Sequence, residues 1–221
     1  MKMRTSYLAC LLLFVSGFTM LYSASDTKKA ESIMKQVQKK YQRIKSLQAD
    51  FEQSFKWELA GETQEVKGVI YLQEGNHYRI ETDTQLIVTD GKTLWTYSQP
   101  DQQVIIDLLN HSAENPLPKD ILFQYSEEYK PVAMHDETLN HQKTYMIELT
   151  PKDKDTFITS MNIWIEKDNL FTVKVEQTDI NGNVNSYLIR DIKENPVLDA
   201  GLFSFKIPQN TEVIDLRENG E

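Results

Sequence analysis

The sequence predicts a mainly β fold, an unclosed antiparallel β-barrel of about ten or eleven strands, in which an N-terminal helix and a short lid helix cover an apolar cavity. Three observations support this prediction. Residues 47–59 alternate between apolar and polar side chains, and short apolar runs separated by turn residues recur along the chain. Residues 26–46, near the N-terminus, have apolar residues at the spacing of a helix. A sheet of so many strands has to curl.

The first 25 residues have the composition of an export signal peptide. Lys2 and Arg4 precede an apolar stretch at residues 7–18, and small residues at 23–25 allow cleavage after Ala24 or Ser25. The stretch is short for a membrane helix, which needs roughly 20 apolar residues. We expect residues 1–25 to be removed, which leaves residues 26–221 as a single domain in the periplasm.

Cysteine content and charge narrow the class of protein. Cys10 is the one cysteine and lies within the apolar stretch, so the mature chain is expected to contain no disulfide. Loss of Lys2 and Arg4 leaves 22 basic and 33 acidic residues, a net charge of −11. Such a chain is repelled by nucleic acid and by anionic membrane surfaces.

The first predicted element after the leader is an amphipathic helix over residues 26–46. Its apolar residues recur at spacings of three and four, so they form one stripe above a charged back. The helix therefore has to lie on an apolar surface. The stripe consists of Ala30, Ile33, Met34, Val37, Tyr41 and Ile44.

The following segment is the clearest strand in the sequence. Within residues 47–59 every odd position except Gln53 is apolar, and the even positions are polar. Strict alternation of this kind indicates a strand with one buried face. Further strands are predicted at residues 64–73, 77–82 and 104–107, separated by turn residues.

Residues 86–97 predict a β-hairpin around Asp90-Gly91. A two-residue loop at that pair places Leu86 opposite Trp95 on one face and puts Ile87 and Leu94 on the other. Both faces are apolar, whereas a hairpin that is wet on one side would alternate. We therefore expect a sheet with a covered back and an aromatic front.

The series of predicted antiparallel strands is interrupted at residues 108–125. Pro116 and Pro118 are incompatible with a regular ladder, yet the segment keeps apolar side chains that suit a lid, namely Leu117, Ile121 and Leu122. The second half resumes with strands at residues 145–149, 161–165, 171–175 and 184–192, then a helical turn at 199–203 and a last strand at 204–207.

No catalytic motif is present. The sequence lacks the zinc-protease, nucleophile-elbow, P-loop and dinucleotide-binding patterns, and its four histidines lie apart in polar surroundings. Asp153 and Asp155 lack the glycine and terminal glutamate of a calcium loop. We therefore expect neither an enzyme nor a metal or cofactor site.

The unusual feature is the number of large apolar side chains assigned to the concave side of the curled sheet. They form either a filled core or a dry cavity suited to acyl chains. The cavity candidates are Phe51, Phe55, Trp57, Ile70, Leu72, Tyr78, Ile80, Leu86, Val88, Trp95, Tyr97, Ile163, Ile165, Phe171 and Val173.

Residues 88–97, V-T-D-G-K-T-L-W-T-Y, strongly resemble the V-S-D-G-K-T-L-W-x-Y signature of the LolA family of periplasmic outer-membrane lipoprotein carriers. Further similarity covers nearly all of the chain after the leader in order. It includes residues 49–53, Gly68, residues 149–152, 181–183 and 203–205.

The resemblance implies an unclosed barrel whose cavity takes acylated lipoproteins from an inner-membrane ABC transporter (LolCDE-like) and passes them to an outer-membrane acceptor (LolB-like), with the carrier a monomer. It places Tyr78 near the cavity mouth. Glu74-Gly75 departs from the family pattern of a basic residue and proline that latches the lid, so Arg79 is the candidate latch.

Two alternatives share the half-barrel. One is a lipid-sensing regulatory module like RseB, which normally carries an additional domain. The other is a membrane-anchored acceptor like LolB, which requires lipidation of Cys10.

Overall fold

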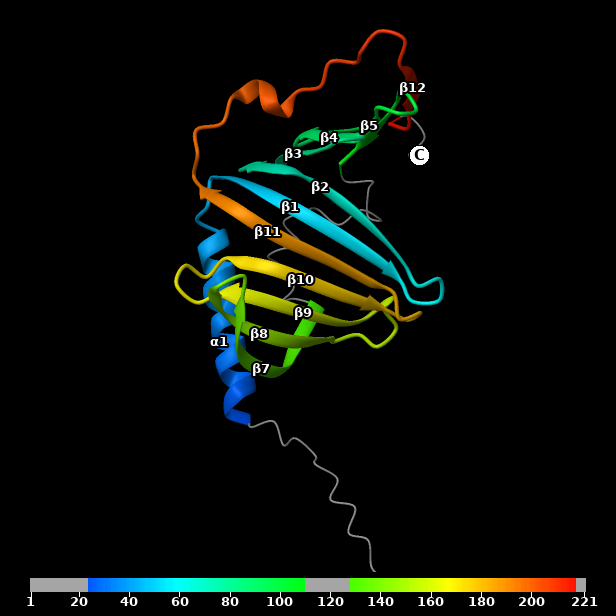
Figure 1. Cartoon of the computed structure of the whole chain (residues 1–221). Coiled ribbons are helices and arrows are strands. Elements are labelled where there is room, and N and C mark those ends of the chain that lie inside the picture. Colours follow the sequence, from blue (N-terminus) through cyan, green and yellow to red (C-terminus); the bar gives the residue numbers. More distant parts are fainter. Residues whose placement is uncertain (1–23, 110–127, 218–221) are drawn as a thin grey trace, which may run out of the picture.

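A computed structural model describes residues 24–109 and 128–217 of the chain (Figure 1). It consists of one helix, one short 3-10 helix and a single twelve-stranded sheet. The elements are α1 (Ala24–Tyr41), β1 (Ser46–Trp57), β2 (Glu62–Gln73), β3 (His77–Thr82), β4 (Gln85–Asp90), β5 (Thr93–Ser98), β6 (Gln103–Leu108), β7 (Tyr129–Leu139), β8 (Gln142–Pro151), β9 (Ile158–Glu166), β10 (Thr172–Asp179), β11 (Val184–Glu194), η1 (Ala200–Phe203) and β12 (Glu212–Asp215).

The sheet is built from two meanders that meet at its centre. Strands β1–β6 form one half and β7–β11 the other, and β1 pairs with β11 at the seam, where Phe51 lies opposite Ile189. The pairs are antiparallel except for β12, which runs parallel to β6. Strands β12 and β7 are the two edges, so the sheet curls without closing (Figure 1). The predicted mainly β, unclosed architecture is confirmed, with twelve strands rather than ten or eleven.

Helix α1 packs on the concave side of the second half of the sheet. Its predicted apolar stripe is confirmed, because Ala30 and Val37 are fully buried and Tyr41 and Ile44 pack partly buried against the core. The helix ends at Tyr41 rather than at residue 46, since Ser46 already begins β1. The buried sheet residues of this core include Leu47, Ala49, Ile70, Ile147, Leu149, Met161, Ile163, Ile165, Val175 and Ile189.

The C-terminal strap, residues 195–211, leaves β11 and crosses the convex side of β3–β5 before β12 joins β6 (Figure 1). Three contacts hold it there. The Arg79 guanidinium donates from Nη1 to the carbonyl oxygen of Leu202 at 3.2 Å. The ring of Phe203 lies 5.7 Å from that of His77, and the ring of Phe205 lies 5.7 Å from that of Tyr97.

Two strand predictions were wrong. Residues 204–207 belong to the strap and form no ladder, while the last strand is β12. Strand β7 was not predicted, because its edge position, Pro131 and a register shift before Ala133 break the alternation. The lid candidates Leu117, Ile121 and Leu122 and residues 1–23 of the predicted signal peptide lie outside the described residues.

Candidate functional site

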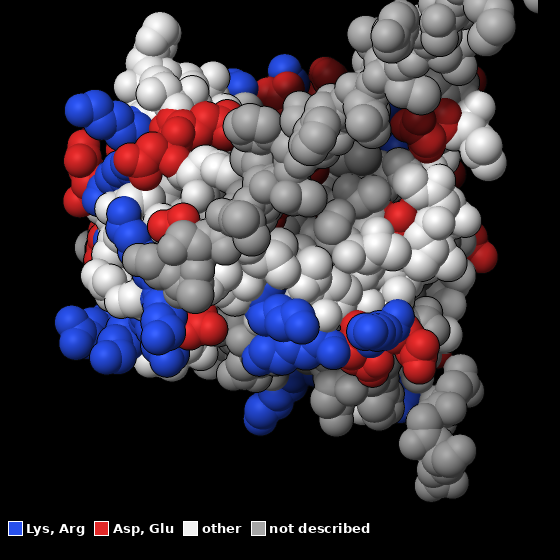
Figure 2. All heavy atoms as spheres, turned by 90° about the horizontal axis from the view of Figure 1, so that it is seen from below, with Lys and Arg blue, Asp and Glu red and all other residues white. Residues whose placement is uncertain are grey.

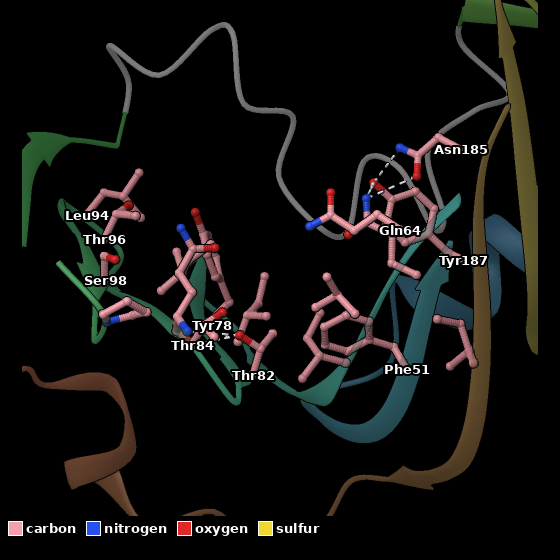
Figure 3. Close-up of a pocket in the computed structure, with 18 of the residues that line it drawn as sticks. Phe51, Gln64, Tyr78, Thr82, Thr84, Leu94, Thr96, Ser98, Asn185 and Tyr187 are labelled. Atoms are coloured by element: carbon pink, nitrogen blue, oxygen red, sulfur yellow. Dashed lines mark hydrogen bonds between the residues drawn. The ribbon is translucent and has the colours of Figure 1, made fainter. Parts of the chain in front are cut away.

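The concave face of β1–β5, continued by β10 and β11, surrounds a cavity of about 880 Å³ (Figure 3). Ligand pockets for small molecules typically measure about 300–1,000 Å³, so this cavity lies toward the large end of that range. Its lining has an apolar part and a polar part. The apolar residues are Phe51, Val66, Ile70, Tyr78, Ile80, Ile87, Leu94, Pro100 and Ile189.

Strand pairing explains why these side chains share one face. Ile70 lies opposite Ile80, and Ile80 opposite Ile87, so three adjacent strands contribute a row of isoleucines. Directly opposed residues of paired strands point to the same side of a sheet. The row crosses the floor of the cavity.

Gly68 allows the ring of Phe51 to lie against β2. The two residues are paired, and a Cβ at position 68 would lie 2.8 Å from Cε1 of Phe51 and 2.1 Å from the carbonyl oxygen of Glu81. Neither distance is compatible with a side chain. Because residue 68 is a glycine, the ring of Phe51 can lie flat against β2, and the volume over the ring belongs to the cavity.

Tyr78 contributes a neutral aromatic ring to the lining. It is 6% exposed, and burial raises its pKa to about 12. The phenol therefore remains protonated at neutral pH. It stands opposite Leu72 on one side and Thr89 on the other.

A second group of lining residues is polar and hydrogen-bonded. The Gln53 amide nitrogen donates to Oδ1 of Asn185 at 3.0 Å and to the Tyr187 hydroxyl oxygen at 3.2 Å. The Asn185 amide donates to the same hydroxyl oxygen at 3.0 Å. Figure 3 shows Asn185, Tyr187 and Gln64 together at one side of the cavity, across from Leu94 and Ser98. We call Gln53, Asn185 and Tyr187 the amide cluster.

Charged groups are almost absent from the lining. Among the described residues of the lining there is no lysine, arginine or histidine, and the one acid is Asp101, whose carboxylate accepts a hydrogen bond from Ser98 at 2.5 Å. Among the described residues in the view from below, Lys and Arg side chains gather along the left and lower edges, and uncharged residues lie nearer the middle (Figure 2). Among the described residues no group of acidic, histidine or cysteine side chains could hold a metal ion.

The predicted cavity residues fall into three places. Phe51, Ile70, Tyr78 and Ile80 are in the lining. Others contribute to the core or border it away from the cavity: Ile163 and Ile165 are fully buried, Phe171 and Val173 are 6% and 4% exposed, and Leu72 packs against the core. Phe55 and Trp57 lie near the end of β1 outside the lining, with ring centroids 4.6 Å apart, and Trp57 is exposed.

The third group is on the opposite side of the sheet. Leu86, Val88, Trp95 and Tyr97 share the convex face with Arg79, whereas Ile87 and Leu94 face the cavity. The grouping of side chains within the hairpin was predicted correctly, but the cavity was assigned to the wrong face. Both faces are apolar because the cavity lies on one and the strap covers part of the other.

The predicted hairpin register was also wrong. Leu86 pairs with Tyr97 and Val88 with Trp95, so the loop is Gly91-Lys92, one residue further along the chain. Asp90 remains in β4, and its Oδ1 accepts hydrogen bonds from the backbone N–H groups of Lys92 at 3.0 Å and Thr93 at 2.8 Å. Of the loop residues only Gly91 has a positive φ, at 86°, which fits a turn with glycine at its first central position.

Arg79, the candidate latch, lies on the convex face and contacts the strap. Its side chain is 18% exposed, bonded to Leu202 of the strap and paired with the Glu81 carboxylate at 2.5 Å. The lid that it was predicted to latch, within residues 110–127, lies outside the described residues.

Sequence reasoning missed Ile87, Leu94 and the amide cluster as lining residues. A signal for the cluster was present, because Gln53 is the single polar residue on the apolar face of its strand. A lone amide on such a face indicates a polar neighbour or a polar ligand.

The fold and site define an open β half-barrel with an apolar cavity beside a helix-covered core. Residues 42–206 match the family described as outer membrane lipoprotein carrier protein LolA. Since the match covers most of the sequence, the chain belongs to the LolA family.

Individual relatives agree with this assignment. The outer-membrane lipoprotein carrier proteins of Glaesserella parasuis and Histophilus somni are 29% and 27% identical, with 82% and 83% of this chain and 85% and 87% of those proteins covered. Among solved structures, an uncharacterized conserved protein from Thermus thermophilus has a TM-score of 0.56 at 14% identity, covering 85% of this chain and 99% of that one. LprF from Mycobacterium bovis has a TM-score of 0.50 at 11% identity, covering 84% and 99%. These structures share the fold.

In the described parts of the chain, no helix is both long and apolar enough to cross a membrane.

Proposed function

We propose that this protein is a periplasmic carrier that binds the acyl chains of lipoproteins in the 880 Å³ cavity. The observation that carries the proposal is the apolar floor of that cavity, built from Phe51 and the isoleucine row. Each CH₂ group removed from water contributes about 0.8 kcal/mol, so acyl chains are held firmly without covalent chemistry. The names of the relatives, outer-membrane lipoprotein carrier proteins, support the same cargo.

The route belongs to the proposal as well. Residues 1–25 direct export and are removed, and residues 26–221 act as one monomeric domain. An inner-membrane ABC transporter of the LolCDE type loads the cavity, and an outer-membrane acceptor of the LolB type empties it. Binding and release suffice for this task, so the protein is not an enzyme.

Adjacent residues of β4 offer a matched test. Ile87 lines the cavity and Leu86 faces the other side of the sheet, and both are half-buried. We expect Ile87→Glu to weaken binding of a synthetic dipalmitoylated cysteine peptide by about tenfold or more, since a charge in an apolar cavity is costly. Leu86→Glu should change the dissociation constant by less than about twofold.

Fluorescence titration of the purified mature protein measures both constants. If both variants fold by circular dichroism and lose affinity for the peptide equally, the cavity is not the acyl-binding site. A transfer assay tests cargo directly: the protein should extract acylated lipoprotein from inner-membrane vesicles, and no transfer above buffer contradicts the carrier function. Mass spectrometry of the mature N-terminus separates cleavage near residue 25 from lipidation at Cys10.

A further inference from the structure

The amide cluster occupies an unusual position for polar side chains. Gln53 pairs with Val66 on one side and Tyr187 on the other, on the same face of β1 as Phe51. Burying amides and a phenol on an apolar face is unfavourable unless they form hydrogen bonds. Hydrogen bonds among Gln53, Asn185 and Tyr187 satisfy some of their polar groups.

Counting donors and acceptors shows what the cluster still offers. The Tyr187 oxygen accepts two N–H groups, which uses both its lone pairs and leaves its own O–H hydrogen. Within residues 24–109 and 128–217 no group accepts that hydrogen. The amides of Gln64 and Gln177, which also line this part of the cavity, make no side-chain hydrogen bond in the same ranges. The surplus therefore includes N–H and O–H donors, together with the amide carbonyl acceptors of Gln53, Gln64 and Gln177.

The protonation state of Tyr187 keeps this donor available. Burial raises the pKa of its phenol, an effect larger than the opposing one of the Asn185 hydrogen bond. The hydroxyl consequently carries its hydrogen throughout the physiological pH range.

None of the described lining residues is cationic, and this limits which ligand groups these donors can bind. A carboxylate or phosphate buried there would have no positive partner among the described lining residues, and transferring an unpaired ion from water is costly. Ester and amide carbonyl oxygens accept hydrogen bonds and carry no charge. A neutral wall that offers hydrogen-bond donors beside an apolar floor therefore fits such carbonyl groups.

We infer that the cavity selects acyl chains by the uncharged linkage at their head, with the amide cluster donating hydrogen bonds to ester or amide carbonyl oxygens. The chain then extends from β1 and β11 over Phe51 toward Ile87 and Leu94. Free fatty acids and phosphate-headed lipids bind more weakly than ester-linked or amide-linked acyl groups. The inference rests on the proposed function and specifies its ligand.

Ester and ether analogues separate the carbonyl from the chain. A fluorescent acyl probe is displaced from the purified protein by a diacylglyceryl-cysteine peptide with two ester-linked C16 chains, by its ether-linked analogue of equal chain length, and by palmitate. We expect the ester peptide to bind about tenfold more tightly than the ether analogue, the equivalent of one or two net hydrogen bonds. Palmitate at neutral pH should bind at least about tenfold more weakly than the ester peptide.

Variants assign the preference to the cluster. Tyr187→Phe and Asn185→Leu should bring the ester-to-ether ratio to within about twofold. Tyr97→Phe is the matched control, because Tyr97 lies on the convex face of β5, away from the cavity, and it should keep the ratio.

The outcomes distinguish the two proposals. Equal binding of ester and ether peptides by the unaltered protein, or palmitate binding as tight as the ester, overturns the inference and leaves the carrier function standing. Failure of both peptides to displace the probe overturns the carrier function too. If Tyr187→Phe fails to fold, the unaltered protein and Asn185→Leu still decide the question.

Discussion

Gly68 sets how closely β2 approaches the ring of Phe51, and the cavity floor depends on that approach. In Gly68→Ala the new Cβ would meet the Glu81 carbonyl oxygen, which is backbone and cannot move aside. We expect a loss of about 1–3 kcal/mol in the free energy of unfolding, measured by urea denaturation. Glu62→Ala, an exposed change on the same strand, is the control and should stay within about 0.5 kcal/mol. Equal stability of the two variants would mean that the strands separate at little cost.

Asp179 stabilises the turn between β10 and β11. Its Oδ1 accepts hydrogen bonds from the backbone N–H groups of Asn181 at 2.7 Å and Asn183 at 2.9 Å, and its Oδ2 accepts one from the Asn183 side chain at 2.8 Å. Burial raises the pKa of this carboxyl, but the hydrogen bonds from Asn183, Asn181 and Gly182 together hold it below the ordinary 3.8. The folded state therefore favours the ionised carboxylate.

The stability that Asp179 contributes should depend on pH in one direction. A depressed pKa in the folded state gives a contribution that is complete above the unfolded value of 3.8 and is lost as the pH falls through the lower folded value. We expect Asp179→Ala to unfold at lower urea concentration at neutral pH and to lose less stability on acidification than the unaltered protein. Asp153→Ala, in an exposed turn with one such bond, is the control. If Asp179→Ala and the unaltered protein lose the same free energy of unfolding on acidification, Asp179 is not the group responsible for this pH dependence.

Among the elements, the strap depends on its contact with β3. Arg79 joins β3 to the strap through the Leu202 carbonyl and is bonded to Glu81 beside it. Removing the guanidinium in Arg79→Met should cost about 1–2 kcal/mol of unfolding free energy, because a partly buried carbonyl loses a charged donor. Hydrogen exchange should become faster at residues 199–205.

Acyl binding should be nearly unchanged in Arg79→Met, since Arg79 lies on the face away from the cavity. Arg79→Lys is the matched variant, which keeps the charge without the planar fork. Loss of acyl binding in Arg79→Met with exchange in the strap unaltered would instead favour a latch at the cavity.

A comparison of β1 with the β4–β5 hairpin shows where sequence-based prediction succeeds and where it fails. In β1 one face is wet, so alternation predicted both strand and orientation, and Ala49 is buried while Asp50 is exposed. In β4 and β5 both faces are covered, so alternation could not tell the cavity side from the strap side. The sequence predicted which side chains belong together there, and only the placement of the strap determines which group faces the cavity.

Strands with few or distant partners were the ones missed. Strand β7 has a single neighbour and a register shift, so its side chains need not alternate. Strand β12 pairs with β6, far earlier in the chain, where Glu212 lies opposite Gln103. The β12–β6 pairing depends on the path of the strap across the sheet, so the local sequence pattern could not predict it.

For the whole molecule, an occupied cavity should be more stable than an empty one. Ligand at about 100 times its dissociation constant adds about 2.7 kcal/mol, which for a chain of this size corresponds to a rise of roughly 5–10 °C in Tm. Differential scanning fluorimetry with the dipalmitoylated peptide measures the rise, and Ile87→Glu should reduce it while Leu86→Glu should not. No shift in the unaltered protein under saturating ligand would contradict binding to the folded state.

The seam between β1 and β11 has a consequence for how the chain acquires this structure. Within each meander neighbouring strands are joined by hairpins that can form early, but Phe51 and its partner Ile189 are separated by most of the chain. Closing so long a loop is entropically unfavourable, and folds dominated by such distant pairs form slowly. The two halves should therefore form first and join late. Until the seam closes, the unpaired edge of β1 remains exposed to association with other chains.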